Sequence, residues 1–171
     1  MIPKIIHYCW FGHNPLPNSA IKCINSWKKF FPDYEIREWN EDNFDVESIP
    51  YMAEAYHMKK YAFVSDYARF WVLYYHGGLY FDTDVEVIKP MDDIIERGPF
   101  MGVEIPCKAG FAPGINPGLG LGVSPGFRLY KSILDYYGAL HFVDADGNMI
   151  PGTVVKHTTD VLVLYGLRFT D

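Results

Sequence analysis

The chain has 171 residues, of which 49% are hydrophobic and 17% aromatic, so it is long enough to form one globular domain with a buried core. Its 15 basic and 21 acidic residues give a net charge of -6, which excludes a general electrostatic attraction to nucleic acid or to anionic lipid. We therefore expect a single domain over residues 1–171 and no nucleic-acid partner.

The first part of the chain predicts a strand, a helix and a second strand. Residues 4–11 form an apolar run typical of a buried strand, and residues 18–31 place apolar side chains at helical spacing after two prolines. Residues 34–39 alternate between apolar and polar side chains, as a strand does. This order indicates a right-handed βαβ unit with parallel strands, and the predicted fold class is α/β, with a Rossmann-like mixed sheet flanked by helices.

Helices and short strands are predicted to alternate in the rest of the chain. The middle of the sequence predicts two helices, then a short strand, then an extended segment, at 51–60, 62–75, 79–81 and 85–88. A strand at 100–104, a Gly/Pro-rich segment at 108–123, a helix from Ser124-Pro125 and a last helix at 151–165 follow. Residues 167–169 begin to resemble another strand, so we expect the chain to lack a C-terminal portion of its domain.

Two carboxylates follow the short buried strand at 79–81. In an extended backbone, Asp82 and Asp84 point in the same direction, and a cation between them would relieve their repulsion. Hard oxygen ligands of this kind suit Mg²⁺ or Mn²⁺ and leave coordination positions for substrate phosphates. The alternative is a polar turn that caps the strand. We expect Asp82 and Asp84 to hold the metal ion, at the carboxyl end of a strand where ligands bind in open sheets.

Polar residues also occur on one face of the helix predicted at 62–75. Ser65, Asp66 and Arg69 share this face, although the helix is otherwise apolar nearly all round and therefore buried. Buried charges must be paired or must bind a ligand. Two interpretations remain open: an intrahelical ion pair, or a site in which Asp66 accepts hydrogen bonds from sugar hydroxyls and Arg69 binds sugar or phosphate oxygens.

Two further positions are candidates for ligand contacts. Trp10, at the end of the first strand, is suited to stacking on a nucleobase, although a core role is the alternative. Alternation along the strand places His7 on the opposite face from Trp10, where a hydrogen-bonded core histidine is the simpler interpretation. The glycine-rich segment lacks the Lys-Ser/Thr pair of a P-loop, and its Gly-Leu alternation favours a strand with Asn116 as a side-chain contact.

These motifs together resemble the DXD sugar transferases of glycosyltransferase family 32. The resemblance rests on three segments, Ile2-Pro3-Lys4-Ile5-Ile6-His7-Tyr8-Cys9-Trp10-Phe11-Gly12, Ala62-Phe63-Val64-Ser65-Asp66-Tyr67-Ala68-Arg69 and Gly77-Gly78-Leu79-Tyr80-Phe81-Asp82-Thr83-Asp84-Val85. The order and spacing between Ser65 and Asp84 are its most specific part. Relatives of this kind include yeast mannosyltransferases, bacterial capsule enzymes and, more distantly, the glucosylating clostridial toxins.

The resemblance implies a GT-A fold, a UDP- or GDP-sugar donor, Mn²⁺ or Mg²⁺, and transfer of a hexose with retention of configuration. It implies that Trp10 lies against the base, that Asp66 and Arg69 hold the donor sugar with Ser65 beside them, and that Asp82 and Asp84 are the metal motif. The predicted catalytic residues are Asp66, Arg69 and Asp84. Family members usually continue into a C-terminal segment that completes the metal and diphosphate site. The expected acceptor is a saccharide or a lipid-linked sugar, in surface polysaccharide synthesis.

Two other functions fit parts of the sequence. A haloacid-dehalogenase-like phosphatase also uses a DXD motif at a strand end, but expects Thr or Val where this chain has Glu86. A non-catalytic fragment that binds sugar nucleotides is the other alternative. Donor binding without turnover would indicate the fragment, and phosphate release from a simple ester would indicate the phosphatase.

The cysteines and the N-terminus indicate the compartment. Cys9, Cys23 and Cys107 form no CxxC pair and no metal-ligand spacing, which is typical of reduced thiols. The N-terminal apolar run is too short for a signal peptide, and no stretch reaches the roughly 20 apolar residues of a membrane span. We expect a cytoplasmic protein, and peripheral attachment to the inner face of a membrane stays open because capsule-type acceptors are often lipid-linked.

Overall fold

The computed structural model describes residues 1–104 and 114–168. Cys107, Phe169 and the first part of the Gly/Pro-rich segment lie outside the described residues. The elements in chain order are β1 (Ile5–Cys9), α1 (Asn18–Phe30), β2 (Glu35–Trp39), α2 (Pro50–His57), α3 (Tyr61–His76), β3 (Gly78–Tyr80), α4 (Asp92–Ile95), β4 (Phe100–Met101), β5 (Val103–Glu104), β6 (Gly114–Ile115), the 3₁₀ helix η1 (Pro117–Leu119), β7 (Leu121–Val123), α5 (Arg128–Gly138) and α6 (Val154–Leu164).

A five-stranded mixed sheet in the order β2-β1-β3-β7-β4 forms the centre of the fold. Strand β1 is parallel to β2 and β3, whereas β7 is antiparallel to β3 and β4. Helix α1 connects the parallel strands β1 and β2, which confirms the predicted βαβ unit. Because β1 and β3 are parallel, their carboxyl ends meet at one edge of the sheet, where the chain can form a binding site.

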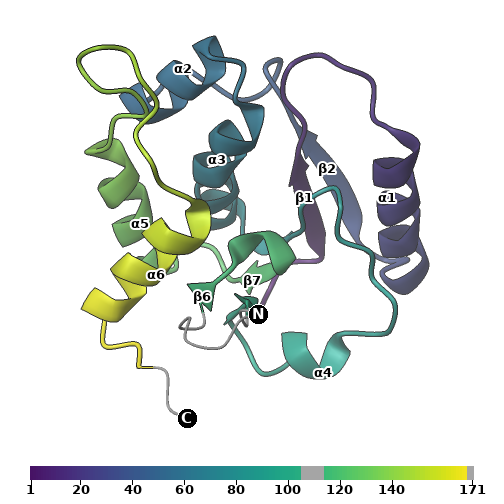
Figure 1. Cartoon of the computed structure of the whole chain (residues 1–171). Helices are drawn as coiled ribbons and strands as arrows, with labels where there is room; N and C mark the ends of the chain where they lie inside the picture. Colours follow the sequence, from purple (N-terminus) through teal and green to yellow (C-terminus); the bar gives the residue numbers. More distant parts are fainter. Residues whose placement is uncertain (105–113, 169–171) are drawn as a thin grey trace.

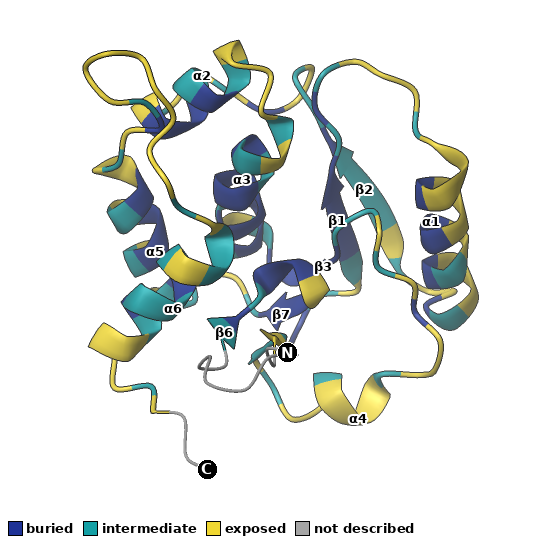
Figure 2. Cartoon of the chain, in the orientation of Figure 1, coloured by how far each residue is buried: buried dark blue, intermediate teal, exposed yellow. Residues whose placement is uncertain are grey.

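Helices cover the sheet on both sides. Figure 1 shows α1 on one side of β1 and β2, and α2, α3, α5 and α6 on the other. Ile6 and Leu79 pack in the cluster that includes the buried face of α1, whereas Cys9 and Tyr80 pack in the cluster that includes α3 and α5. The central strands are dark blue in Figure 2 because both of their faces are buried. This double burial explains their nearly continuous apolar sequence.

Two glycines connect α3 to β3. Gly77 and Gly78 have φ angles of 64° and 101°, in the left-handed region that favours glycine. A Cβ atom on Gly78 would lie 2.5 Å from the carbonyl oxygen of Ile5, so the residue also permits close pairing with the start of β1. The predicted helix stop is therefore confirmed, and it places the residues after β3 opposite the polar face of α3.

Several predicted boundaries differ from the structure. Residues 85–88 form no strand, because the backbone turns at Thr83 and Asp84. The strand predicted at 100–104 is interrupted at Gly102, and its halves β4 and β5 pair with β7 and β6. In the described part of the glycine-rich segment, 114–115 and 121–123 form the short strands β6 and β7. Helix α4 was not predicted because one turn shows no apolar periodicity. Among the described residues, no helix has the length and hydropathy needed to cross a membrane.

Candidate functional site

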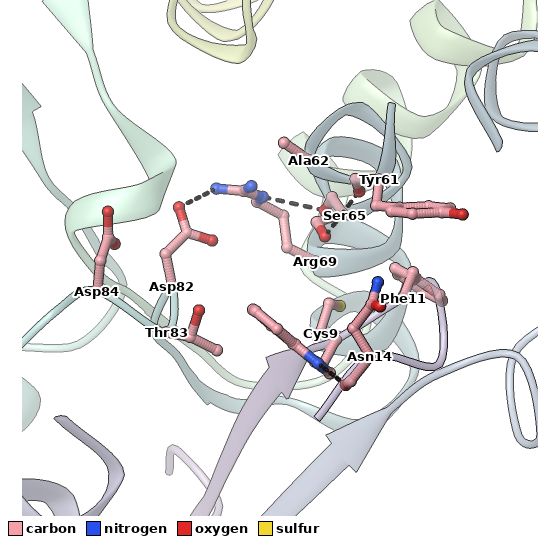
Figure 3. Close-up of a pocket in the computed structure, with 11 residues that line it drawn as sticks. Cys9, Phe11, Asn14, Tyr61, Ala62, Ser65, Arg69, Asp82, Thr83 and Asp84 are labelled. Atoms are coloured by element: carbon pink, nitrogen blue, oxygen red, sulfur yellow. Dashed lines mark hydrogen bonds and ion pairs between the residues drawn. The ribbon is translucent and has the colours of Figure 1, made fainter. Parts of the chain in front are cut away.

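A cleft of about 370 Å³ lies at the carboxyl ends of β1 and β3, against the polar face of α3. Three segments far apart in sequence form its walls: the chain after β1, the first half of α3, and the turn after β3. Figure 3 shows the lining residues, which are Cys9, Trp10, Phe11, Asn14, Tyr61, Ala62, Ser65, Arg69, Asp82, Thr83 and Asp84. The structure therefore brings together five of the predicted site residues, namely Trp10, Ser65, Arg69, Asp82 and Asp84.

Arg69 connects two of these walls. Its Nη1 donates to Asp82 Oδ2 at 3.2 Å, its Nη2 donates to Asp66 Oδ1 at 2.9 Å, and its Nε donates to the Ser65 carbonyl at 3.1 Å. The guanidinium also lies over the Tyr80 ring, 5.0 Å from the ring centroid. Burial alone would lower the pKa of Arg69. The neighbouring Asp82, Tyr80 and Asp66 have a larger, opposite effect, so the pKa is raised. Arg69 is therefore a fixed positive charge with a fixed orientation.

Asp82 is held from two directions. Its Oδ1 accepts a hydrogen bond from the Tyr80 hydroxyl at 3.0 Å, and its Oδ2 accepts from Arg69. Gly118 lies so close that a Cβ atom there would be 2.2 Å from Asp82 Oδ2. These contacts orient the carboxylate before any ligand binds, and a third of the Asp82 side chain, 33%, stays exposed to the cleft.

Asp84 differs from Asp82 in its surroundings. The backbone between them is a turn closed by a hydrogen bond from the Val85 amide to the Asp82 carbonyl at 3.0 Å, so the predicted extended geometry is wrong. Both side chains nevertheless line the same cleft, as Figure 3 shows. Asp84 is exposed, and no hydrogen bond to its carboxylate exists within the described part of the chain.

The two carboxylates fit a hard divalent cation. Around them, the described residues contain no group of three or more His, Cys, Asp or Glu side chains arranged for a metal ion. A cation held here would therefore keep most of its coordination positions for water and phosphate oxygens, which is how proteins usually bind Mg²⁺. The thiol of Cys9 is no substitute ligand, because burial raises its pKa to about 12.

Asp66 lies behind Arg69 and does not line the cleft. Its side chain is only 9% exposed, and the ion pair with Arg69 is the intrahelical pair considered from the sequence. Burial raises the pKa of Asp66 to about 7, although the Arg69 guanidinium opposes this rise. In this arrangement Asp66 orients Arg69, and a direct contact with a sugar stays a prediction.

Trp10 is half-buried and contributes one side of the cleft. Its indole Nε1 donates to the Asn14 carbonyl at 2.6 Å, which fixes the orientation of the ring. Because the N–H group is already used, a ligand can contact only the face of the ring. The Ser65 hydroxyl donates to the Tyr61 carbonyl at 3.2 Å and can still accept a hydrogen bond. The stacking and donor-contact roles of these residues stay predictions.

Asn116 is not among the residues that line the cleft. Its Oδ1 accepts from the Gly118 amide at 2.9 Å, which caps η1, and its Nδ2 donates to Glu104 Oε2 at 3.0 Å. The segment itself approaches the site through Gly118 rather than through the Asn116 side chain. Asn116 therefore shapes the loop beside Asp82, and its contact with a donor stays a prediction.

His7 is a core residue, as the alternation along β1 indicates. It is completely buried, with Nε2 2.9 Å from the Gly77 carbonyl and Nδ1 accepting from Trp39 Nε1 at 3.0 Å. A carbonyl only accepts and an indole only donates, so His7 is neutral with its proton on Nε2. Burial is the main cause that lowers its pKa to about 4.

Sequence reasoning missed Tyr80 and Gly118 as parts of the site. Tyr80 is two positions before Asp82, and the alternation of the strand could have indicated that both side chains point the same way. Gly118 gives no such signal, because its contact with Asp82 joins residues 36 positions apart in the sequence.

Comparisons with known proteins agree with this geometry. The family model described as a glycosyltransferase sugar-binding region containing a DXD motif matches residues 17–101. Inositol phosphoceramide mannosyltransferase 1 of Schizosaccharomyces pombe is 29% identical over 107 residues, which cover 58% of this chain and 33% of that protein. An uncharacterized glycosyltransferase of Acanthamoeba polyphaga mimivirus is 34% identical over 110 residues, which cover 58% of this chain and 42% of that protein.

A structural comparison supports the fold independently. The solved PaToxG glycosyltransferase superposes with a TM-score of 0.66 and 21% identity, covering 96% of this chain and 70% of that one. This likeness confirms the predicted α/β fold of GT-A type. The chain spans a third to less than half of the length of the two sequence relatives. From the family model, these relatives and the Asp82-Thr83-Asp84 motif in the cleft, the chain belongs to the glycosyltransferases whose sugar-binding region contains a DXD motif.

Proposed function

We propose that this chain binds a nucleoside-diphosphate sugar, UDP- or GDP-linked, together with Mn²⁺ or Mg²⁺, and transfers the hexose to a saccharide or lipid-linked acceptor. The observation that supports this most directly is the single cleft that brings Asp82, Asp84, Arg69 and Trp10 together from three segments. Asp82 and Asp84 suit the metal ion, Arg69 suits the diphosphate, and Trp10 suits the base.

The carboxylates would hold the metal ion unequally. Asp84 is exposed and uncommitted, whereas Asp82 already accepts hydrogen bonds from Tyr80 and Arg69. Asp84 is therefore the more available first ligand, with Asp82 directed toward the same cation or toward water bound to it. A bound divalent ion supplies charge neutralisation for the diphosphate leaving group.

Arg69 and Trp10 would position the two ends of the donor. The positive charge of Arg69 would stabilise the negative charge that builds up on the leaving diphosphate. Because the guanidinium is already oriented, it needs no reorganisation at the moment of reaction. Trp10 offers a ring face of fixed orientation, and stacking on it tolerates any base. This leaves uracil and guanine both compatible with the cleft.

We include retention of the anomeric configuration in the proposal because the resemblance to the family implies it. In the described part of the cleft, the carboxylates are Asp82 and Asp84, and both have proposed metal roles. The Cys9 thiol is neutral at ordinary pH because burial raises its pKa to about 12. Attack by the acceptor hydroxyl on the face from which the diphosphate leaves is therefore the route we favour.

The relatives suggest which donor to test first. Several of them are named mannosyltransferases that act on inositol phosphoceramide, so we propose mannose as the first sugar and a lipid- or glycan-linked hydroxyl as the acceptor. Such an acceptor would bring the protein to the inner face of a membrane, and surface polysaccharide synthesis is a process that uses this chemistry.

The non-catalytic alternative remains testable, because the chain spans only part of its relatives. A panel of UDP- and GDP-sugars with Mn²⁺, Mg²⁺ or EDTA, followed by calorimetry and by release of the free sugar, would test both binding and turnover. We expect metal-dependent binding of one nucleotide sugar, which Asp84→Ala abolishes without loss of stability because Asp84 is exposed. Asp93→Ala, an exposed aspartate on α4 outside the cleft, is the control.

Equal binding with metal or EDTA would contradict the metal assignment. Binding without turnover would favour the non-catalytic alternative. Hydrolysis of a simple phosphate ester would favour the phosphatase. That activity is not expected, since both oxygens of Asp82, its would-be nucleophile, are engaged in hydrogen bonds.

A further inference from the structure

Glu41 is a buried carboxylate in the turn that follows β2, and it is not among the residues that line the cleft. Its side chain is only 10% exposed. Its Oε1 accepts a hydrogen bond from the Gly12 amide at 2.5 Å, whereas its Oε2 is buried without a hydrogen-bond partner among the described residues. His13 Nε2 is 3.9 Å from that oxygen, beyond hydrogen-bonding distance. A carboxylate is costly to bury, and buried polar atoms are nearly always paired, so this position requires an explanation.

The turn that carries Glu41 is held firmly by its own hydrogen bonds. The amides of Asn43 and Phe44 donate to the Asn40 carbonyl at 3.2 and 2.9 Å. The Asn40 side chain accepts from the Asp42 amide at 3.0 Å, and the Asn43 side chain accepts from the Asn40 amide at 2.9 Å. Phe44 anchors the end of the turn in the hydrophobic core. The Glu41 carboxylate is therefore presented from a fixed position.

The partner of Glu41 is the loop of residues 10–14, which contributes the Trp10 ring to the cleft. Gly12 and His13 in the middle of this loop have φ angles of 97° and 55°. Both lie in the left-handed region, which is uncommon for a residue that has a Cβ atom, as His13 does. The loop therefore needs contacts with the rest of the fold to keep this conformation.

Three hydrogen bonds hold the loop. At its start the Trp10 amide donates to the Trp39 carbonyl at 2.9 Å, and at its end the Asn14 carbonyl accepts from Trp10 Nε1 at 2.6 Å. The third joins the middle of the loop, at the Gly12 amide, to Glu41. Since an ionised acceptor makes a stronger hydrogen bond than a neutral one, Glu41 is well suited to hold a strained backbone segment.

We propose that Glu41 is a positioning residue, which holds the loop of residues 10–14 so that Trp10 presents its ring face to the base of the nucleotide. Glu41 acts through Trp10 and not by contact with the ligand, because it lies outside the lining of the cleft. This inference rests on the proposed function and adds to it the contact that fixes the base-binding wall. It also explains why the fold tolerates a buried carboxylate with one unpaired oxygen.

The test compares Glu41→Ala, Glu41→Gln and Trp10→Ala, together with the double variant that combines Glu41→Ala and Trp10→Ala. Asp42→Ala is the matched control, because Asp42 is an exposed acidic residue of the same turn and its replacement changes the net charge equally. Binding of UDP and of GDP with Mn²⁺ is measured by calorimetry. The temperature is one at which melting curves show that every variant is folded.

We expect Glu41→Ala to bind the preferred nucleoside diphosphate more weakly by about tenfold or more, a loss within the range of stacking on an aromatic ring. This loss should occur although the substitution removes a negative charge near a site for an anion. Glu41→Gln keeps an acceptor oxygen for the Gly12 amide and should bind within about threefold of the wild type. Asp42→Ala should bind as the wild type does. In the Trp10→Ala background, Glu41→Ala should cause a further loss of less than about twofold, because the two residues act as one unit.

Four results would overturn the inference. One is a Glu41→Ala variant with wild-type affinity, and another is a Trp10→Ala variant with wild-type affinity. The third is an equal loss in Glu41→Gln and Glu41→Ala, which would assign the effect to the charge of Glu41 and not to its hydrogen bond. The fourth is a full further loss in the Trp10→Ala background, which would show that Glu41 does not act through Trp10. Wild-type protein that binds neither UDP nor GDP would instead contradict the proposed function as a whole, and the role of Glu41 with it.

Discussion

Gly118 provides a steric test of the metal motif that leaves both aspartates in place. A Cβ atom at this position would lie 2.2 Å from Asp82 Oδ2, whereas real Cβ contacts under 3.0 Å are essentially never found. In Gly118→Ala the carboxylate must therefore move by about 1 Å, which takes Oδ2 out of hydrogen-bonding range of Arg69 Nη1, now at 3.2 Å. The substitution changes no charge, so its effect reports on geometry alone.

The expected magnitude follows from the contacts that are lost. A hydrogen bond to a charged group contributes about 1.5–3 kcal/mol, and overpacking by one methyl group costs about 1–3 kcal/mol. Because Asp82 is partly exposed and can relax into the cleft, we expect unfolding free energy to fall by about 2 kcal/mol. A displaced carboxylate should weaken metal-dependent binding of nucleotide by about 10- to 100-fold, as outer-shell changes at metal sites do.

Two assays on the same samples check this prediction. Urea unfolding gives the change in stability, and calorimetry with nucleoside diphosphate gives the affinity with Mn²⁺ and with EDTA. Gly138→Ala on α5, where no atom lies within 4 Å of the added Cβ, should leave the affinity unchanged and the unfolding free energy equal or higher by at most about 1 kcal/mol, because alanine restricts the unfolded chain more than glycine does. If Gly118→Ala folds and binds the metal and nucleotide as tightly as the wild type, metal-dependent nucleotide binding does not require the observed orientation of Asp82.

Three further predictions concern other residues. Trp10→Ala should weaken nucleotide binding by about 1–3 kcal/mol if the ring stacks on the base; a large loss of melting temperature with unchanged affinity would assign the ring to the core. Arg69→Lys keeps the charge but cannot bridge Asp66 and Asp82, so binding of the nucleotide sugar should fall at least tenfold and unfolding free energy by about 1–3 kcal/mol; normal binding would refute the bridging role. The pKa of His7 is lowered from 6.5 to about 4 in the folded protein, so on acidification the unfolded chain takes up the proton first. The stability that neutral His7 contributes is therefore complete above pH 6.5. It declines by about 1.4 kcal/mol per pH unit as the pH falls toward 4. NMR of the imidazole nitrogens should show a neutral Nε2–H ring at pH 5.5, and protonation near pH 6.5 in the folded protein would contradict this.

Local patterns were sufficient to predict the elements that carry the site. The apolar run before Trp10, the nearly apolar helix around Ser65 and Arg69, and the strand before Asp82 are each determined by side chains close together in sequence. Period-two and period-3.6 spacing depend on the backbone alone, so these predictions needed no knowledge of the rest of the fold. One-turn elements such as α4 have no such period, and they were missed.

The partners of each polar group depended on the tertiary structure. The sequence left Asp66 and Arg69 with two interpretations, and the packing of α2 and α5 on α3 decided that Asp66 is buried behind Arg69. It also decided that both oxygens of Asp82 are engaged.

The same limit applies to the loop that contains Asn116 and Gly118. The sequence by itself determined a sugar-transferase motif on an α/β scaffold, because spacing along the chain fixes which residues follow the strands. Only the tertiary structure placed Gly118 against Asp82 and turned Asn116 toward Glu104. The physical reason is that contacts between residues far apart in the sequence depend on how β7 and β3 pair, and local propensity contains no information about that pairing.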